Sequence, residues 1–570
     1  MDFWQIFIRV LLRRPLPALG ALWWHATRRR VRARNRIQAA GAPLPFAYKF
    51  WIRNLERLDD LERRAAETLN GWRSKPEFSV ILYCAGSSDE DVARSIRSVE
   101  LQTYPHANLT VIGHASGQSY REEIDGSWPE ALHCSSGDFI VPLRAGDQLS
   151  RWALFHFAES LQAEPGAEIL YGDEDEMDLA GQRLRPWFKP RWNKELFLAR
   201  DYLSRACAIR RSIVRRDMIA PDAQLPILRL LLELTDDASR SIVHVPRIVS
   251  HVDRTVPQDQ AAAVAAVSRQ VSNAGGVACV GPFGSVKVSW PLPSEPPLVS
   301  ILVPTKDKLE LLRPCVESVL ERTRFEPFEL LILDNASVEP QTRAYLRDIQ
   351  THDRVRVISY PKPYNFSAIN NEAVREAAGS YLCLLNNDTE IVCDDWLSEM
   401  MRYAARPDIG AVGAKLLYTD GRIQHAGVVV GVGGAAGHAH RNLPAHDEGY
   451  FGQPHLTQYV SAVTAACLLI DKRKFLAVGG FDEERLAIAF NDVDLCLKLE
   501  RAGWRNIYVP HAVLIHHESK SRGNDYAPGQ IDRYRRELEV FQNRWGTKTY
   551  EDPLLNPNLD RSGETFVIRF

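Results

Sequence analysis

The stretch Gly379-Ser-Tyr-Leu-Cys-Leu-Leu-Asn-Asn-Asp388-Thr-Glu390 decides the fold of this chain. Its apolar run has the length of a buried strand and ends abruptly in amides and carboxylates. In an open α/β sheet, ligands bind in the crevice outside the carboxyl ends of the strands. We therefore expect Asp388 to lie where a divalent cation and a phosphate can meet, with Glu390 assisting from farther out. The alternative interpretation is an ordinary polar turn after a strand.

Strand-helix-strand units of this kind occur twice along the chain. The apolar spacing predicts strands at 78–84, 109–112, 299–303 and 329–333, and helices at 89–102 and 309–322. Ile112-Gly-His-Ala-Ser116 aligns with Leu333-Asp-Asn-Ala-Ser337, and residues 137–146 align with 379–388. This internal repeat predicts an α/β protein with two copies of one scaffold.

The two copies differ in their acids. Gly113 and Gly146 stand in the first copy where the second copy has Asp334 and Asp388. Asp147 follows one residue late and could compensate for Gly146. We expect a shared scaffold with a different chemistry in each half.

Length and composition describe an ordinary multidomain protein. With 570 residues, of which 45% are hydrophobic and 25% charged, the chain can form two or three domains with cores of their own. The 70 basic and 72 acidic side chains nearly balance, so the net charge does not point to nucleic acid. Nine cysteines without a CxxC pair indicate buried thiols of a reducing compartment. No apolar stretch approaches the roughly eighteen residues of a membrane span.

Residues 1–40 depart from this balance. They combine apolar and aromatic side chains with nine arginines and a single acid, Asp2. Such a pattern suits contact with the headgroup layer of an anionic membrane. A helix packed on the protein's own body and a disordered basic tail are the alternatives. A cleaved signal peptide is disfavoured because Arg9, Arg13 and Arg14 interrupt the apolar run.

Polar residues of the second half recur at the ends of predicted strands and at a helix start. Asp334 directly follows the strand 330–333, where a carboxylate can accept hydrogen bonds from a ribose or a nucleobase, or can cap the next helix. Asp492 and Asp494 open a helix, and if one of them caps it, the other is left to act as a base. His516 ends a short strand and could bind a metal or a diphosphate.

Together these motifs resemble the catalytic domain of family 2 glycosyltransferases, which have the GT-A fold, and especially the bacterial surface-polysaccharide members such as rhamnosyltransferases and O-antigen synthesis proteins. The resemblance covers residues 298 to about 523. It is carried by Asp334-Asn-Ala-Ser, Asn365-Phe-Ser-Ala-Ile-Asn-Asn371, Leu385-Asn-Asn-Asp388, Ile423-Gln-His-Ala-Gly427, Phe490-Asn-Asp-Val-Asp494 and His516-His-Glu-Ser-Lys-Ser-Arg-Gly523.

The first half is similar to a domain often found ahead of this one. The similarity is carried by Tyr171-Gly-Asp-Glu-Asp-Glu-Met-Asp178 and Pro186-Trp-Phe-Lys-Pro-Arg-Trp192. This half offers only Asp222-Ala-Gln where an acidic pair before a helix would be expected. We therefore expect it to be inactive as a transferase.

The resemblance implies a role for each candidate residue. Asp492 would be the catalytic base, and Asp388 and His516 would hold Mg²⁺ or Mn²⁺. The donor nucleotide would lie against Asp334, Asn335, Asn387 and Arg522. Secondary or acceptor-side candidates are Asp494, His425 and His517. His517 replaces His516 if the placement slips by one residue.

The implied reaction is an inverting, metal-dependent transfer of a sugar to a hydroxyl of a growing cell-surface glycan, free or lipid-linked. The donor would be a UDP- or dTDP-sugar, such as dTDP-rhamnose. The enzyme would be cytoplasmic, with peripheral contact to the inner membrane through residues 1–40. Two alternatives stay open: a bifunctional polymerase with both halves active, and a noncatalytic scaffold of a polysaccharide-assembly complex.

The expected architecture is two tandem GT-A (Rossmann-like, mixed-sheet) domains behind a basic helical extension. The expected segments are a partly amphipathic extension at 1–75, a degenerate GT-A-like domain at 76–253, a linker at 254–297, the catalytic domain at 298–545 and a tail at 546–570.

Overall fold

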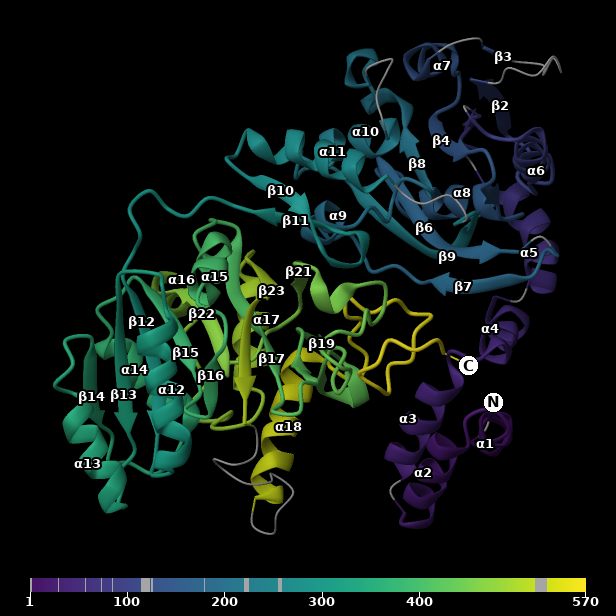
Figure 1. Ribbon diagram of the computed structural model, residues 1–570. Coiled ribbons are helices and arrows are strands. Elements are labelled where there is room, and N and C mark those ends of the chain that lie inside the picture. Colours follow the sequence, from purple (N-terminus) through teal and green to yellow (C-terminus); the bar gives the residue numbers. More distant parts are fainter. Residues whose placement is uncertain are drawn as a thin grey trace.

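Two α/β halves of similar construction form the body of the molecule (Figure 1). The computed structural model describes residues 3–28, 30–56, 58–72, 74–84, 86–113, 123–124, 127–178, 180–219, 225–254, 259–517 and 530–569. Each half is a mixed sheet with helices packed on it, and an apolar core lies against each sheet face.

The first half is built on a sheet whose strands, in spatial order, are β3 (Glu123–Ile124), β2 (Ala107–Ile112), β1 (Phe78–Tyr83), β4 (Phe139–Arg144), β8 (Cys207–Arg210), β6 (Ile169–Met177), β9 (Ile242–Val252) and β5 (Gln148–Leu149), with β7 (Arg183–Trp187) paired to β6. β1 runs parallel to β2 and β4, whereas β8 is antiparallel to β4 and β6. β1 is an almost continuous apolar run because both faces of the sheet are covered.

The second half repeats this order. Its strands are β14 (Val355–Ser359), β13 (Phe328–Asp334), β12 (Val299–Thr305), β15 (Tyr381–Leu385), β22 (Cys467–Asp471), β17 (Ile409–Leu417), β23 (Arg505–His516) and β16 (Thr389–Ile391), with β18 (Ile423–His425) paired to β17 and β21 (Gln458–Val460) to β23. β12 runs parallel to β13 and β15, and β22 is antiparallel to β15 and β17. The two sheets therefore confirm the internal repeat and the mixed-sheet α/β fold.

Helices flank both sheets (Figure 1). Those of the first half are α6 (Asp89–Glu100), α7 (Trp128–Cys134), α8 (Ala153–Ala163), α9 (Lys194–Ala199) and α10 (Pro226–Leu234). Those of the second half are α12 (Leu309–Arg322), α13 (Pro340–Ile349), α14 (Phe366–Glu376), α15 (Trp396–Ala404), α16 (Lys472–Ala477), α17 (Asn491–Arg501) and α18 (Ile531–Trp545). In α12, Leu312, Val316 and Val319 recur at helical spacing and are buried, as the sequence predicts.

The N-terminal extension is helical and packs on the body. It contains α1 (Phe3–Leu11), α2 (Pro15–Ala26), α3 (Arg30–Gly41), α4 (Pro45–Trp51), a π-helical turn (Ile52–Glu56) and α5 (Leu58–Gly71). The ring of Trp51 lies 4.9 Å from that of Phe188 in the first half. The alternative of a disordered tail is therefore wrong for the described part of this segment. None of the described helices combines the length and the apolar character needed to cross a membrane.

Residues 254–297, whose composition favours a linker, contain ordered elements. α11 (Gln260–Ser272) is followed by a hairpin of β10 (Val277–Val280) and β11 (Val286–Ser289). Val267 and Val271 of α11 and Val286 and Val288 of β11 are buried in a core of the first half. Alanine and valine at helical and alternating spacing supply enough apolar surface for this packing, so most of the segment is part of the first half.

The C-terminal segment after α18 returns to the first half. Leu554, Leu559 and Ile568 are buried although the segment has little regular structure. The side-chain amide of Asn556 donates to both carboxylate oxygens of Asp173 at 3.0 Å. A short hairpin, β19 (Val428–Val430) with β20 (Ala436–His438), packs beside this segment, because the Val430 N–H donates to Asp552.

Candidate active site

Three parallel strands of the second sheet end side by side. β12 lies between β13 and β15, and Thr305 at the end of β12 is in register with Asp334 at the end of β13. Asn387, just beyond β15, donates from Nδ2 to the hydroxyl of Thr305 at 3.0 Å. Asp334 and Asn387 therefore lie on either side of Thr305, at the crevice where open α/β sheets bind ligands.

Asp334 and Asn335 have different surroundings. Asp334 is partly exposed, and its carboxylate accepts a hydrogen bond from the Ser337 N–H at 2.9 Å. Asn335 is buried, and its side-chain amide donates to the carbonyls of Tyr360 and Lys362 at 2.9 and 2.7 Å. Asp334 can thus meet a ligand directly, whereas Asn335 braces the loop after β14.

Asp388 and His516 form a buried pair. The His516 Nε2 lies 3.1 Å from the Asp388 Oδ1, and the two side chains are 6% and 2% exposed. They meet because β16 and β23 are antiparallel and pair Thr389 with His516. The other ring nitrogen, Nδ1, lies 3.1 Å from the Gln424 Oε1. When Gln424 accepts the Nδ1 proton, the Nε2 lone pair of neutral His516 faces a carboxylate oxygen, an arrangement that a shared proton or a cation stabilises.

His517 directly follows β23 and has different partners. Its Nε2 lies 3.5 Å from the Glu390 Oε2, and its N–H donates to the Asp388 carbonyl at 2.8 Å. The geometry therefore favours His516 over His517 as the partner of the Asp388 carboxylate. Arg522 lies outside the described residues.

Asp492 approaches the same region from the first turn of α17. Its Oδ2 accepts a hydrogen bond from the Ala465 N–H at 3.1 Å. The next residue, Ala466, accepts a hydrogen bond from the Asn386 N–H at 3.1 Å. Asn386 is two residues before Asp388, so both acids are held beside the short turn that precedes β22.

Asp494 and His425, expected as secondary or acceptor-side residues, are too deeply buried to face an acceptor. The Asp494 carboxylate accepts hydrogen bonds from Arg544 at 2.7 Å and from the Trp545 indole at 2.9 Å, so it anchors α18 to α17. His425 is 0% exposed, and its Nδ1 lies 2.9 Å from the Nδ1 of His438. Burial lowers the pKa of His425 well below its usual value and keeps the ring neutral. Both side chains are enclosed by the protein and cannot reach solvent. They therefore support the structure around the site rather than contact a substrate.

Two residues of the site were not selected from the sequence. Gln424 orients His516, and the side-chain amide of Asn386 lies 3.3 Å from the His516 Nε2. Both stand inside motifs that identified the family resemblance, next to His425 and Asn387.

The pair of Asp388 and His516 fits a divalent cation. A carboxylate oxygen and an imidazole nitrogen are ligand types that Mn²⁺ accepts, and Gln424 would orient the ring from behind. The described residues contain no group of three or more His, Cys, Asp and Glu side chains that could hold a metal.

In the first half, an ion pair occupies the position that corresponds to Asp388 in the second half. Asp147 is 1% exposed, and its carboxylate accepts hydrogen bonds from Arg205 Nε at 2.8 Å and from the Asp253 N–H at 2.8 Å. A carboxylate already paired with a guanidinium is a poor cation ligand, which argues against Asp147 compensating for Gly146. Asp222 lies outside the described residues.

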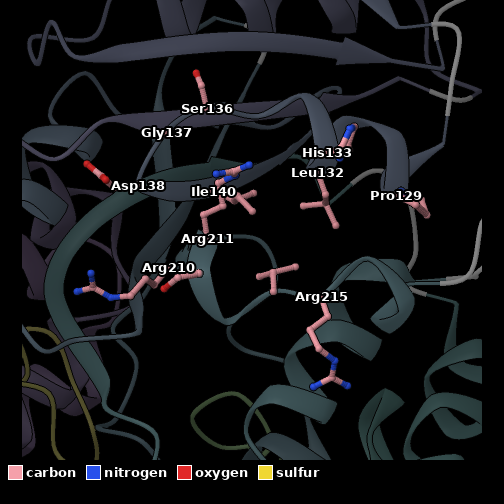
Figure 2. Close-up of a pocket in the computed structure, with 12 residues that line it drawn as sticks. Pro129, Leu132, His133, Ser136, Gly137, Asp138, Ile140, Arg210, Arg211 and Arg215 are labelled. Atoms are coloured by element: carbon pink, nitrogen blue, oxygen red, sulfur yellow. The ribbon is translucent and has the colours of Figure 1, made fainter.

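A cavity of about 470 Å³ occurs at the opposite edge of the first sheet (Figure 2). It is bordered by Gly137 and Asp138, which directly precede β4, and by Arg210 and Arg211 at the end of β8. Asp147 follows the other end of β4. The cavity is therefore not the first-half counterpart of the carboxylate site.

Comparisons with known proteins identify the proteins to which this chain is similar. Residues 300–432 match the model of glycosyl transferase family 2. The chain is 38% identical over 502 residues to the uncharacterized protein y4gI of Sinorhizobium fredii, covering 85% of this chain and 54% of the relative. It is 37% identical over 453 residues to the O-antigen biosynthesis protein RfbC of Myxococcus xanthus, covering 75% of this chain and 34% of the relative. The chain thus spans about half or less of the length of these two relatives.

A further relative aligns with a shorter part of the chain. The N-acetylglucosaminyl-diphospho-decaprenol L-rhamnosyltransferase of Mycobacterium tuberculosis is 26% identical over 259 residues, covering 40% of this chain and 78% of the relative. The family match spans β12 to β19, including the edge that carries Asp334 and Asp388. This segment of the chain thus matches glycosyl transferase family 2, as its motifs predict.

Proposed function

We propose that the second half is an inverting, metal-dependent glycosyltransferase that moves a sugar from a nucleoside-diphosphate donor to a hydroxyl of a cell-surface glycan. The observation that carries this proposal is that Asp388 and Asp492 lie beside the same short turn before β22. The Asn386 N–H, two residues before Asp388, donates to the Ala466 carbonyl, and the Ala465 N–H donates to the Asp492 carboxylate, each at 3.1 Å.

In this proposal the residues act at the two ends of the transferred sugar. Asp334 and Asn387 receive the nucleoside, with Asn335 bracing the wall of the crevice. Asp492 takes the proton from the acceptor hydroxyl as that oxygen attacks the anomeric carbon, and one displacement inverts the configuration. Asp388 and His516 would hold Mg²⁺ or Mn²⁺, which when bound neutralises the negative charge of the departing diphosphate.

The named relatives suggest the substrates. RfbC is described as an O-antigen biosynthesis protein, and the mycobacterial relative as a rhamnosyltransferase acting on a diphospho-decaprenol carrier. We propose dTDP-rhamnose as the donor and a lipid-linked glycan as the acceptor. A cytoplasmic location and peripheral contact with the inner membrane through residues 1–40 complete the proposal, and the nine free cysteines suit a reducing compartment.

A single active centre is favoured over the bifunctional alternative. The ion pair of Asp147 with Arg205 occupies the position from which the first half would bind a cation. The first half would then serve as a structural platform for the second. Of the segments expected from the sequence, we retain 298–545 as the catalytic domain.

A panel of nucleotide sugars tests the proposed function. The purified chain, given Mn²⁺ or Mg²⁺, should release nucleoside diphosphate from one donor, and EDTA should abolish the release. Asp388→Asn should lower the rate by about a hundredfold or more, since it removes a charge that acts on the leaving group. Asp420→Asn, an exposed acid of the same half, is the matched control and should keep full activity.

Two results would contradict the proposal: full activity of Asp388→Asn, or full activity in EDTA. Release from two different donors, of which only one depends on Asp388, would instead support the bifunctional alternative.

A further inference from the structure

The hairpin of α1 and α2 exposes a row of large apolar side chains. Trp4 and Ile8 of α1 and Leu12, which directly follows α1, are 49%, 58% and 81% exposed. On α2 the exposed residues are Leu16, Leu19 and Trp23, which are 78%, 53% and 57% exposed. We call these six side chains the N-terminal face. Few other large apolar side chains of the described residues are as exposed.

The N-terminal face is not the packing side of the helices. Ile6, Phe7 and Val10 of α1 and Ala18 and Ala21 of α2 are buried instead. Both helices pack on α3, so the exposed residues, at spacings of three or four, form stripes on the sides turned away from it. An apolar core is therefore already formed without the N-terminal face.

The two stripes run side by side. The His25 ring near the end of α2 lies 4.5 Å from the Phe3 ring and 5.4 Å from the Trp4 ring at the start of α1, so the helices are antiparallel neighbours. Leu12 and Leu16 flank the turn that joins the helices, and Trp4 and Trp23 lie toward the opposite end. A contiguous apolar surface of this kind on a folded protein marks an interaction site.

The charges around the N-terminal face have one sign. The chain contains no Asp or Glu from residue 3 to residue 55. The arginines Arg9, Arg13, Arg14 and Arg28 are exposed on the same two helices or at their ends. Pairing the face with a second copy of itself would bring these cations together, which is unfavourable. An anionic lipid surface instead offers both an apolar interior and opposite charge.

We propose that the N-terminal face inserts into the headgroup region of an anionic membrane, with Leu12 and Leu16 entering the acyl boundary and the arginines binding lipid phosphates. Tryptophan favours this interface because its ring is apolar and its N–H is polar. The proposal specifies which side chains make the contact, and it does not depend on the transferase reaction.

Vesicle co-sedimentation of the full chain tests this proposal. The wild-type chain should pellet with phosphatidylcholine vesicles that contain a quarter phosphatidylglycerol, and much less with phosphatidylcholine alone. Leu12→Asp/Leu16→Asp should lower the partition coefficient by more than about tenfold, because two exposed leucines lose their lipid contact. Arg13→Gln/Arg14→Gln should weaken binding at low salt and reduce its salt dependence.

The matched control is Leu101→Asp/Leu476→Asp, which changes two leucines that are 53% and 56% exposed elsewhere. It should bind like the wild type, and all variants should keep the thermal midpoint of the wild type because the changed residues are exposed. Equal binding by Leu12→Asp/Leu16→Asp and the wild type would overturn the proposal, as would no binding by the wild type. A wild-type dimer that this variant converts to a monomer, without vesicle binding, would assign the face to a second copy.

Discussion

At the scale of single residues, two acids that are two positions apart in α17 have opposite surroundings. Asp492 is partly exposed and is steadied by the Ala465 N–H. Asp494 is 0% exposed and is held by Arg544, Trp545 and Lys498. Asp492 is accessible, as a residue that takes a proton from a substrate must be. Asp494 instead holds α17 and α18 together. This difference predicts separate phenotypes for their substitution.

Asp492→Asn should abolish turnover while leaving the fold and donor binding intact. The amide keeps the shape of the side chain but cannot accept a proton, so kcat should fall by a factor of about a hundred to ten thousand. Single-turnover assays and donor titration by calorimetry measure the two effects. Normal turnover would remove Asp492 from the catalytic role, and loss of donor binding would place it in the donor site.

Asp494→Ala should destabilise the protein. It leaves the partly buried Arg544 and the Trp545 N–H without their carboxylate, although Arg544 retains Asp482 at 2.5 Å. Breaking a buried ion pair in this way costs about 3 kcal/mol. Urea unfolding measures the change in free energy. A loss below about 0.5 kcal/mol would show that α18 is anchored elsewhere.

At the scale of elements, the central strand β17 carries an uncompensated cation. Every residue of β17 from Ile409 to Leu416 is buried, and Lys415 among them is 5% exposed. Burial lowers the pKa of Lys415 from 10.5 to about 8. Its Nζ has a carbonyl partner in Ala445 at 3.4 Å, a long hydrogen bond.

Lys415→Met should therefore stabilise the protein near neutral pH. Below pH 8 lysine is protonated in both the folded and the unfolded state, and the folded state bears the full cost of the buried charge. Between pH 8 and 10.5 the unfolded state binds more protons, so wild-type stability rises with pH. The substitution should add up to about 3 kcal/mol at pH 7 and flatten this rise. Urea unfolding at pH 7, 9 and 10 measures both, and a destabilised variant would contradict the argument.

At the scale of the whole molecule, polar contacts hold the two halves together. Asn193 of the first half exchanges two hydrogen bonds with the backbone of Tyr459, at 2.9 and 3.1 Å. Arg406 of the second half pairs with Glu195 at 2.6 Å, and the Glu195 side chain is 2% exposed. The C-terminal segment adds the hydrogen bonds from the Asn556 side-chain amide to the Asp173 carboxylate.

A double-mutant cycle tests the contact between Arg406 and Glu195. Arg406→Met should lower the free energy of unfolding by about 3 kcal/mol, because it leaves the buried Glu195 carboxylate without its cation. Adding Glu195→Gln should recover about 1 kcal/mol or more, since the stranded charge is gone. Calorimetric and urea midpoints of the single and double variants measure the coupling. Additive losses would show that the two side chains act independently and that the halves rely on other contacts.

Local patterns in the sequence were sufficient to predict the scaffold. Strand and helix periodicity located β1, β2, β12, β13, α6 and α12, and the repeated order of these elements predicted a duplicated mixed-sheet fold. The acids at strand and helix ends were visible for the same reason, because the end of an apolar run is a local feature. The ordered packing of α11 was missed because alanine-rich composition does not reveal whether a partner surface is available.

The sequence by itself determined the repeat, the family motifs and the identity of Asp334, Asp388, Asp492 and His516 as candidates. Only the tertiary structure decided which of them meet. Asp388 and His516 are 128 positions apart, and His516 and Gln424 are 92 apart, so their contacts depend on strand register rather than on any local pattern. The burial of Asp494 and His425 and the pairing of Asp147 with Arg205 also depend on the tertiary structure, because solvent access and charge pairing are properties of the packed chain.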